Sequence, residues 1–418
     1  MKEAEKSGQK KRRLRKQRRI GRPNAVLYFL LWLFLRPYYR FRYGVRYDTG
    51  VLRGIRGPAL ILAPHTSTRD HWFIAMALYP ARATFVVSEH FYARPILRIF
   101  MKLAHAIPKK MFCADMGTIR RLLRARQEGN IMVLFPEGRL SCNGRTGHVT
   151  DGTAALVRKL GCDVYTVTAN GAALSFPKWA KNTRKGRIDV RAERLFTAEE
   201  AVGIPIGELE ARLCAAIAHD DAAAMRGICY RSAAMAEGLD GILYRCPSCG
   251  REFAMRTEGD RLICACGKTC RLTPDYRLEG APFESILSWY DWQSDMLDLD
   301  SPLEARVRIG TPDAKGYMQA DAGEGLLHLD RERLICEGQV NGMPLSFVIP
   351  TERITAFPIT VGSHIDVYWN NRLFYMSPLP DPRAAVKWVA YLDRLVGERT
   401  EAALASHISD RVTVGVAE

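Results

Sequence analysis

A histidine and an aspartate five positions apart could form a catalytic pair in this sequence. His65 and Asp70 follow an apolar run at residues 59–62, which Gly57 and Pro58 precede, so a short buried strand is predicted there. The carboxylate would orient the imidazole and leave its other ring nitrogen free to take a proton from a hydroxyl group. The alternative is an aspartate that only begins the following helix, beside an incidental histidine.

A second group of polar residues follows another apolar run. Residues 131–135 predict a strand, and Glu137, Gly138 and Arg139 lie in the turn after it. Because the carboxyl ends of parallel strands meet at one edge of a sheet, the two turns would bring the histidine–aspartate pair close to an acid and a guanidinium. The alternative is a surface ion pair between Glu137 and Arg139 that takes no part in chemistry.

The elements around both turns predict an α/β fold, with a sheet covered by helices on both faces. Between residue 50 and residue 193, apolar strands alternate with amphipathic helices. Further strands are expected at 84–87, at 164–169 and, at the edge of the sheet, at 187–191. Helices are expected at 95–103, after the capping residue Asp115, and at 153–160.

Together the two motifs resemble the glycerolipid acyltransferase family, whose best-known members are the lysophosphatidic acid (1-acyl-sn-glycerol 3-phosphate) acyltransferases. The resemblance rests on His65-x4-Asp70 followed by Phe135-Pro136-Glu137-Gly138, and it covers residues 27–221. It implies that His65 is the general base and that Asp70 orients it. The free hydroxyl of a lysophospholipid would then attack the thioester of acyl-CoA or acyl-carrier protein.

The resemblance also implies which residues bind the acceptor. Ser67 stands where the family often has a small hydroxyl residue, and its expected role is positional. Glu137, Gly138 and Arg139 would shape the pocket for the glycerol phosphate, with Arg139 as its electrostatic clamp. We therefore expect the acceptor to lie against the turn after the second strand.

Lysine stands where the family's middle block usually has a phosphate-binding arginine. The matching segment, residues 106–112, carries Lys109 and Lys110, of which we slightly favour Lys110. Lysine binds phosphate as a point charge and lacks the bidentate geometry of arginine. The replacement of arginine by lysine bears on the identity of the acceptor more than on the reaction.

The charge of the chain and its first 47 residues indicate a membrane surface. The formal net charge of +16 favours an anionic partner such as a membrane, a nucleic acid or a phosphorylated substrate. A basic run at 10–19 precedes an apolar run at 25–35, which is shorter than the roughly 20 residues that a membrane-spanning helix needs. Arginines and aromatic residues follow it, as in segments that lie in the headgroup layer. We predict a peripheral or monotopic protein at the anionic cytoplasmic face of the cell membrane; the alternative is a helix packed on the protein.

A cysteine cluster resembles a zinc ribbon. The expected zinc ligands are Cys246, Cys249, Cys264 and Cys266. Only one residue separates Cys264 from Cys266, where a zinc ribbon usually has two. Cys270 therefore competes with Cys266 as the fourth ligand. Four thiolates leave no open position on the ion, so the site would be structural; the alternative is a hairpin with free cysteines. The odd total of 11 cysteines fits a reduced compartment better than a disulfide framework.

The C-terminal part predicts a β-rich domain that resembles a pleckstrin-homology-like barrel. Strands are expected at 306–309, 326–329, 345–349, 364–369 and 372–375, and one helix is expected from Asp381 to Gly397. This architecture by itself implies no ligand. The predicted boundaries are 1–47 for the basic arm and membrane segment, 48–240 for the acyltransferase domain, 241–275 for the zinc ribbon, 285–400 for the β-rich domain and 401–418 for a tail.

The resemblance favours an O-acyltransferase that converts 1-acyl-sn-glycerol 3-phosphate to phosphatidic acid. Its partners would be an anionic membrane surface, a lysophospholipid acceptor and an acyl thioester donor. The alternatives are acylation of glycerol 3-phosphate or a lyso-aminolipid, and a lipid-binding scaffold without activity. A basic zinc-ribbon protein that binds nucleic acid is the alternative from another class. We expect no nucleic-acid partner, because the basic run adjoins an apolar segment and not a recognition helix.

Overall fold

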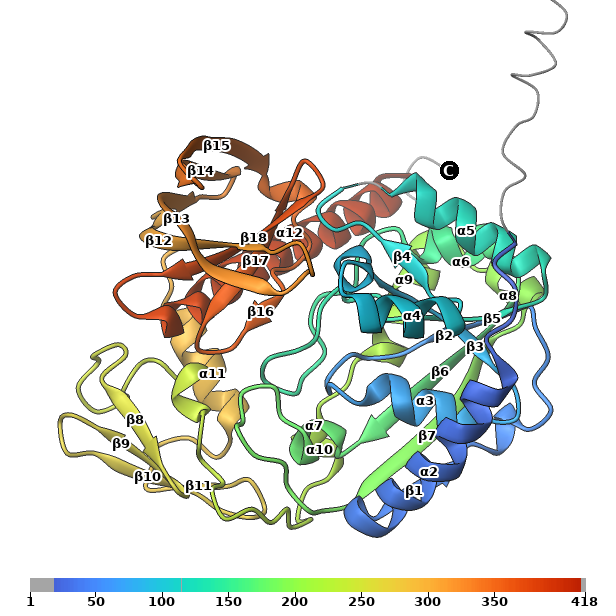
Figure 1. Cartoon of the computed structure of the whole chain (residues 1–418), viewed down its shortest axis with the longest axis horizontal. Helices are drawn as coiled ribbons and strands as arrows, with labels where there is room; N and C mark the ends of the chain where they lie inside the picture. Colours follow the sequence, from blue (N-terminus) through green and yellow to red (C-terminus); the bar gives the residue numbers. More distant parts are fainter. Residues whose placement is uncertain (1–18, 114, 415–418) are drawn as a thin grey trace, which may run out of the picture.

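The computed structural model describes residues 19–113 and 115–414, with side chains to residue 400. Most of the basic run at 10–19 and the side chains of the predicted tail lie outside these residues. Three sheets occupy separate regions of the molecule (Figure 1). The first half of the chain forms one of them, and the second half forms a small sheet and a larger C-terminal one.

The first sheet has seven strands in the order β1-β7-β6-β2-β5-β3-β4. The strands are β1 (Val45–Asp48), β2 (Ala59–Leu62), β3 (Ala83–Ser88), β4 (Ile107–Lys109), β5 (Ile131–Leu134), β6 (Asp163–Asn170) and β7 (Ile188–Phe196). Neighbouring strands are parallel except for β6 and β7, which are antiparallel. Since β1 pairs with the outer side of β7, the predicted edge strand at 187–191 lies inside the sheet.

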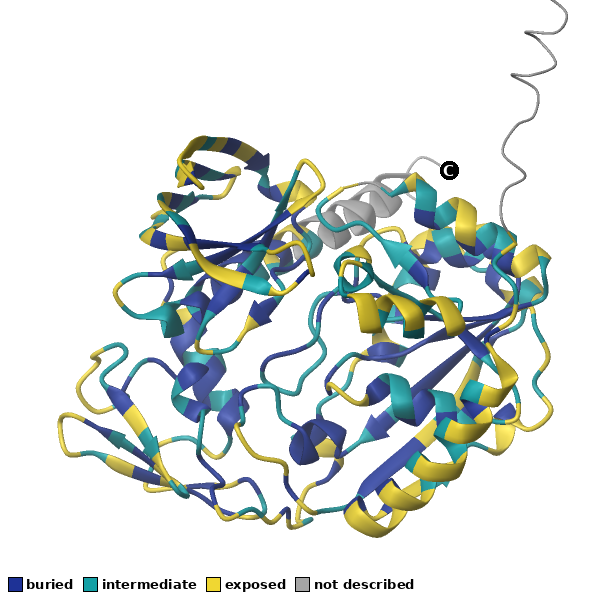
Figure 2. Ribbon diagram, viewed as in Figure 1, coloured by how far each residue is buried: buried dark blue, intermediate teal, exposed yellow. Residues whose placement is uncertain are grey.

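Helices cover both faces of this sheet, as the strand–helix alternation predicts. The helices on one face are α2 (Ala25–Tyr43) and α3 (Asp70–Leu78). On the other face lie α5 (Met116–Gln127), α6 (Thr153–Leu160), α8 (Ala198–Gly203) and α9 (Ile206–Ile217). In β2, Ile61 packs into one hydrophobic cluster while Leu60 and Leu62 pack into the other, so the whole strand is buried (Figure 2). A continuous apolar strand is the sequence signature of this two-sided burial.

Shorter elements complete this half of the molecule. The helix α4 (Pro95–Leu103) follows β3, and its bounds are the predicted ones. The one-turn helices α7 (Ala172–Ser175) and α10 (Asp221–Ala224) lie beyond the carboxyl end of β6 and contact each other. The predicted cap Asp115 accepts a hydrogen bond from Thr118 N at 3.1 Å and begins α5.

The small sheet carries the cysteine cluster. Its antiparallel strands are β8 (Met255–Glu258), β9 (Arg261–Cys264), β10 (Thr269–Leu272) and β11 (Leu278–Glu279). The helix α11 (Ile286–Asp295) follows and places Trp289 in a hydrophobic cluster that extends from this sheet into the C-terminal one. The two sheets therefore share a core.

The C-terminal sheet has seven antiparallel strands in the order β15-β14-β13-β12-β18-β17-β16. The strands are β12 (Leu303–Pro312), β13 (Met318–Leu329), β14 (Arg333–Val340), β15 (Met343–Pro350), β16 (Ile359–Thr360), β17 (His364–Trp369) and β18 (Arg372–Pro378). The β-rich prediction is thus confirmed, with β14 and β16 added. Asn370 and Asn371 have φ angles of 48° and 61° and form the predicted tight turn.

The final helix, α12 (Ala385–Val414), continues past Gly397, where the prediction ended it. Leu392 and Leu395 are buried against the C-terminal core just before that glycine. A glycine inside a helix costs only about 1 kcal/mol relative to alanine. The packing of the preceding turns outweighs this local preference.

Arg383, just before α12, fastens the small sheet to the C-terminal domain. Its guanidinium donates to Met255 O and Phe253 O, both at 2.6 Å, and to Asp240 Oδ2 at 3.0 Å. We expect Arg383→Ala to cost about 1–3 kcal/mol, because these acceptors lose a charged donor. Amide hydrogen exchange in residues 244–264 should then quicken by about tenfold or more.

Arg277→Ala is the matched control, because the exposed Arg277 side chain pairs with Asp275 at the protein surface. This substitution should leave exchange in the same segment nearly unchanged. Equal effects of the two substitutions would contradict the fastening role of Arg383.

Candidate active site

His65 and Asp70 meet side chain to side chain where β2 leads into α3. His65 Nδ1 lies 3.0 Å from Asp70 Oδ2, and the same oxygen accepts a hydrogen bond from Ser67 N at 2.8 Å. Asp70 is the first residue of α3, where the helix dipole stabilises negative charge. Burial raises the pKa of its carboxyl, while the bonds from His65 and Ser67 act in the opposite direction. The Ser67 backbone thus contributes to the placement of the carboxylate.

The surroundings of His65 suit a general base. An Asp70 carboxylate accepts the proton on Nδ1, which leaves Nε2 with a free lone pair. The imidazole stacks on the Phe135 ring, with centroids 4.2 Å apart and planes inclined by 20°. These two contacts hold the ring in one orientation. Because the ring is partly exposed, it also remains accessible.

Glu137 ties the turn after β5 to the turn after β2. Its buried carboxylate accepts hydrogen bonds from His65 N at 2.6 Å and from Gly147 N at 2.8 Å. Ser141 N donates to His65 O at 2.8 Å in return. Burial raises the pKa of Glu137, while the two backbone donors lower it. The structure thus brings the two sequence motifs together and assigns Glu137 to the support of the His65 backbone.

Arg139 has a different partner from the one that the sequence predicts. We expected it to clamp a phosphate, but its side chain is buried and Nη2 lies 2.5 Å from Asp393 Oδ2 of α12. Asp393 raises the pKa of Arg139 against the effect of burial. The geometry therefore assigns Arg139 to an ion pair between the turn and the C-terminal domain, and it does not support the clamp.

The two candidate lysines point to different places. A Cβ atom built on Gly138 would lie 4.0 Å from Lys109 Nζ, so this ammonium is beside the Glu137 turn. Burial lowers the pKa of Lys109. Lys110 Nζ instead donates to Asn371 Oδ1 at 2.9 Å, in the C-terminal domain. Of the two, Lys109 is the one that the structure places near the motifs.

Sequence reasoning missed two charged residues near the site, one buried and one partly buried. Asp221 accepts hydrogen bonds from Gly171 N and Ala173 N, both at 2.5 Å, and acts electrostatically on Asp70. Lys178 Nζ donates to Leu140 O at 3.1 Å, and burial lowers its pKa to about 8. Both lie outside any motif, and only the tertiary structure reveals them.

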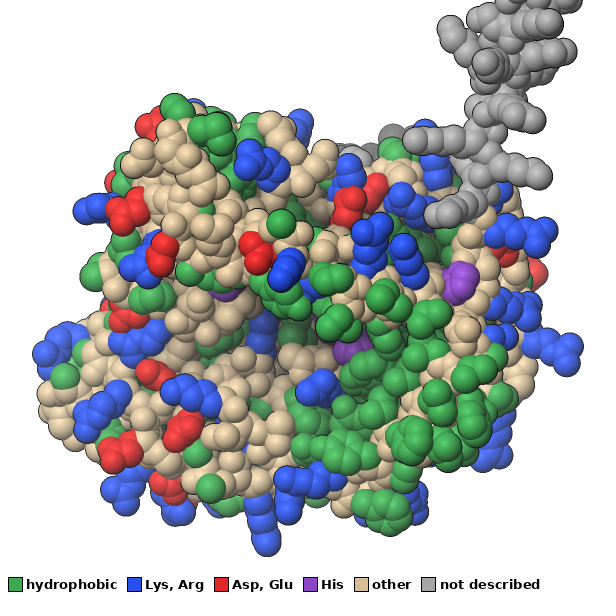
Figure 3. All heavy atoms as spheres, viewed as in Figure 1, with side chains coloured by type: hydrophobic (Ala, Val, Ile, Leu, Met, Phe, Trp, Pro, Cys, Tyr) green, Lys and Arg blue, Asp and Glu red, His purple; other side chains and the backbone are tan. Residues whose placement is uncertain are grey.

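A small crevice runs past Lys178 and beside the turn that carries His65. Its lining includes Thr66 and Cys142 from the first half of the chain and Tyr276 and Leu287 from the second half. The hollow between the two halves is visible in the space-filling view (Figure 3). The second half of the chain therefore contributes to the walls around the turn that carries His65.

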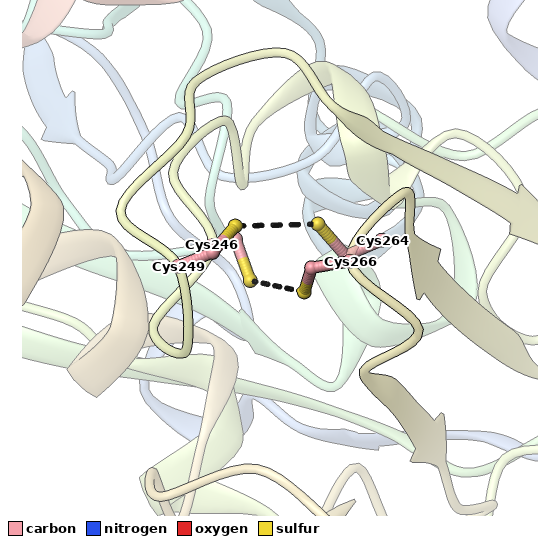
Figure 4. Close-up of side chains that lie close together, drawn as sticks. All are labelled: Cys246, Cys249, Cys264 and Cys266. Carbon is pink, nitrogen blue, oxygen red and sulfur yellow. Dashed lines mark hydrogen bonds between the residues drawn. The ribbon is translucent and has the colours of Figure 1, made fainter.

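The four predicted cysteine ligands lie together (Figure 4). Their Sγ atoms are within 4.8 Å of one another, and the pairs Cys246–Cys266 and Cys249–Cys264 are each 3.8 Å apart. Zinc–sulfur bonds of about 2.3 Å in a tetrahedron require sulfur atoms about 3.8 Å apart, so the cluster fits a zinc ion. The rival Cys270 lies outside it, with its Sγ 3.5 Å from Gly280 O.

The membrane-segment prediction falls on α2, which begins at Asn24 with a side-chain cap. Exposed apolar residues lie along this helix: Val26, Phe29, Leu30, Leu33, Phe34, Tyr38 and Phe41. In the part of the chain that the structure describes, no helix combines the length and the apolar character needed to cross a bilayer.

The ion pair between Arg139 and Asp393 yields a stability prediction. Asp393→Asn leaves a buried guanidinium without its counter-charge, and since Asp393 is 33% exposed we expect a loss of about 1–3 kcal/mol. A lower urea midpoint would report this loss. Asp291→Asn is the control, because Asp291 and its partner Arg145 are each 42% exposed and should contribute less than about 1 kcal/mol. Equal midpoints for the two variants would contradict the assignment.

One family model matches the segment that carries both motifs. The family model described as Acyltransferase matches residues 46–170, which contain His65, Asp70 and Glu137. The chain is also similar to the crystal structure of the 1-acyl-sn-glycerophosphate (LPA) acyltransferase PlsC from Thermotoga maritima. That match has a TM-score of 0.39 and 15% identity, and covers 46% of this chain and 78% of that chain. Residues 46–170, which carry both motifs, are thus similar to the acyltransferase family.

Proposed function

We propose that this protein transfers a fatty acyl group from acyl-CoA or acyl-carrier protein to the free hydroxyl of a lysophospholipid. The acceptor we favour is 1-acyl-sn-glycerol 3-phosphate, which would yield phosphatidic acid. The observation that carries the proposal is the His65–Asp70 pair, with Glu137 bound to the His65 backbone, inside the acyltransferase match. Glycerol 3-phosphate and lyso-aminolipids are the alternative acceptors.

The proposed reaction needs one base and no covalent enzyme intermediate. His65 Nε2 takes the proton of the acceptor hydroxyl as its oxygen attacks the thioester carbonyl carbon. The tetrahedral oxyanion collapses, the carbon–sulfur bond breaks, and the thiolate leaves with the proton that His65 had taken. Asp70 keeps the other ring nitrogen protonated throughout and stabilises the transient imidazolium.

We assign the acceptor's phosphate to Lys109 in place of Lys110 and Arg139. Lys109 Nζ lies beside Gly138, whereas Lys110 and Arg139 each bind a residue of the C-terminal domain. A partly buried ammonium next to the Glu137 turn would interact with an anionic headgroup at reduced dielectric. Ser67 would act through its backbone N–H on Asp70.

The proposed location is an anionic membrane at its cytoplasmic face, with α2 in the headgroup layer. The exposed apolar residues of α2 are accompanied by the basic residues Arg36, Arg40 and Arg42. Apolar contact combined with cationic attraction is how interfacial helices bind anionic lipids. A peripheral position would bring the acceptor lipid to the enzyme within its own membrane.

We further propose that Cys246, Cys249, Cys264 and Cys266 hold a structural zinc ion. The sulfur spacing and the four-thiolate donor set support this role. Zinc would link the loop before β8, which carries Cys246 and Cys249, to the end of β9 and the turn after it, which carry Cys264 and Cys266.

The activity proposal is tested by His65→Ala in the full-length chain. Loss of a general base should lower the acyl-transfer rate by at least about a hundredfold on the true acceptor. The assay compares 1-acylglycerol 3-phosphate, glycerol 3-phosphate and a lyso-aminolipid, each with acyl-CoA and with acyl-carrier protein. His328→Ala is the control, because this histidine pairs with Glu304 on the C-terminal sheet. Wild-type rates with His65→Ala on every acceptor would refute the assignment.

The zinc proposal predicts one zinc ion per chain by elemental analysis. Cys266→Ser should lower the zinc content and destabilise the small sheet, because a structural site loses one of its four ligands. Cys270→Ser should leave the content at one ion, since that thiol lies outside the cluster. If Cys266→Ser kept its full zinc content and Cys270→Ser lost zinc, Cys270 and not Cys266 would be the fourth ligand.

A further inference from the structure

The helix α4 carries aliphatic residues for which the fold supplies no core. None of its nine residues is buried. Ile96, Ile99 and Leu103 are 75%, 62% and 42% exposed. Their spacing of three and four places them on one face of the helix. A row of exposed aliphatic side chains next to other apolar surface marks an interaction site and not ordinary surface composition.

This row is continuous with the apolar surface of α2. Asn24 N, at the start of α2, donates to Leu103 O, at the end of α4, with a length of 2.9 Å. Between the two helices, the Trp72 ring of α3 meets the Phe100 ring of α4 edge to face at 5.8 Å. Figure 3 shows hydrophobic side chains gathered over α2, α3 and α4 on one face of the molecule. The three helices thus present one apolar face.

Basic side chains accompany this apolar face. Arg98 and Lys102 are exposed on α4, as Arg40 and Arg42 are on α2. Arginine and lysine next to inserted apolar residues favour an anionic lipid surface over a neutral one, by on the order of 1 kcal/mol for each charge close to the surface. An uncharged apolar partner would leave these cations without a complementary charge.

The catalytic turn lies at the edge of this face. Asp70 begins α3, and Trp72, in the first turn of the same helix, takes part in the contact with α4. Because α3 contacts both α2 and α4, its N-terminus, where His65 and Asp70 meet, adjoins the surface that these helices form. With α2 alone, the protein could rotate about the axis of that helix; a second contact removes this freedom.

We propose that α4 is a second membrane-contacting helix, which inserts Ile96, Ile99 and Leu103 into an anionic bilayer and, together with α2, sets the His65 turn against the lipid surface. The proposal extends the membrane association proposed above for α2. It does not depend on the identity of the acyl acceptor.

The test uses flotation of the full-length protein with vesicles of phosphatidylcholine and phosphatidylglycerol. Ile96→Glu combined with Ile99→Glu should weaken binding by at least about tenfold, since two inserted aliphatic residues are lost and two like charges are added. The matched control is Met343→Glu combined with Val348→Glu, which changes two exposed apolar residues on β15 of the C-terminal sheet. Binding of the α4 variant equal to that of this control would overturn the proposal.

A gain of signal complements this loss of binding. Ile99→Trp should add fluorescence that brominated lipids quench, while Val348→Trp should add fluorescence that they leave unchanged. Equal quenching of the two added tryptophans would contradict insertion of α4.

A second copy of the chain is the other partner that could cover this apolar face, and light scattering without lipid tests it. A wild-type dimer that the α4 double variant dissociates, with flotation unaltered, would assign this face to self-association and overturn the proposal.

An activity measurement separates this inference from the function on which it rests. The α4 double variant should keep its rate on a short-chain, monomeric lysophospholipid and lose rate on the same headgroup embedded in vesicles. An equal loss on both acceptors would contradict a role of α4 at the membrane. If the wild-type chain transfers no acyl group to any acceptor, the acyltransferase proposal fails, and flotation and quenching still decide the role of α4.

Discussion

The parallel pairing of β2 with β5 is the constraint on which the candidate site depends. Leu62 and Leu134 are register partners, so the two strands end together and their turns leave the sheet at the same edge. The Glu137 carboxylate then spans the turns by accepting the His65 N–H. A buried carboxylate with two backbone donors is costly to displace, because its charge would remain without hydrogen bonds in a low-dielectric interior.

Residues of the second half of the chain contact the segments around this site from outside the first sheet. Asp393 of α12 holds Arg139, Asn371 binds Lys110, and the Tyr368 hydroxyl lies 3.1 Å from His90 Nδ1. These contacts reach the segments after β3, β4 and β5, which surround the carboxyl edge of the sheet. The second half of the chain is therefore part of the wall around the turn that carries His65, and a description limited to residues 46–170 omits it.

The proposed active site and the proposed membrane contact lie on adjoining parts of one surface. Hydrophobic side chains gather over α2, α3 and α4, and a hollow lies beside them (Figure 3). The arrangement suits a substrate whose reactive hydroxyl is polar and whose acyl chain remains in lipid. The proposed zinc site lies at the small sheet and shares no residue with the proposed active site.

Local patterns in the sequence determined much of this structure. Several of these patterns act through the backbone of neighbouring residues. They are the apolar runs that form β2 and β5, the Asp115 cap of α5 and the paired asparagines after β17. The partners His65 and Asp70 are also close in sequence, so a single turn suffices to join them. The cysteine spacing likewise defined the four-sulfur cluster except for the choice between Cys266 and Cys270.

Only the tertiary structure decided what long-range packing controls. Arg139 and Asp393 are 254 positions apart, and no periodicity relates the turn after β5 to α12. The strand β7 left the edge of the sheet because β1 pairs beside it, and α12 passed Gly397 because core packing outweighs a local preference. Lys109 and Lys110 are neighbours of the same chemical type, and the folded sheet alone directs one toward Gly138 and the other toward Asn371. Charge partners and side-chain directions depend on distances between remote segments, which a linear pattern does not encode.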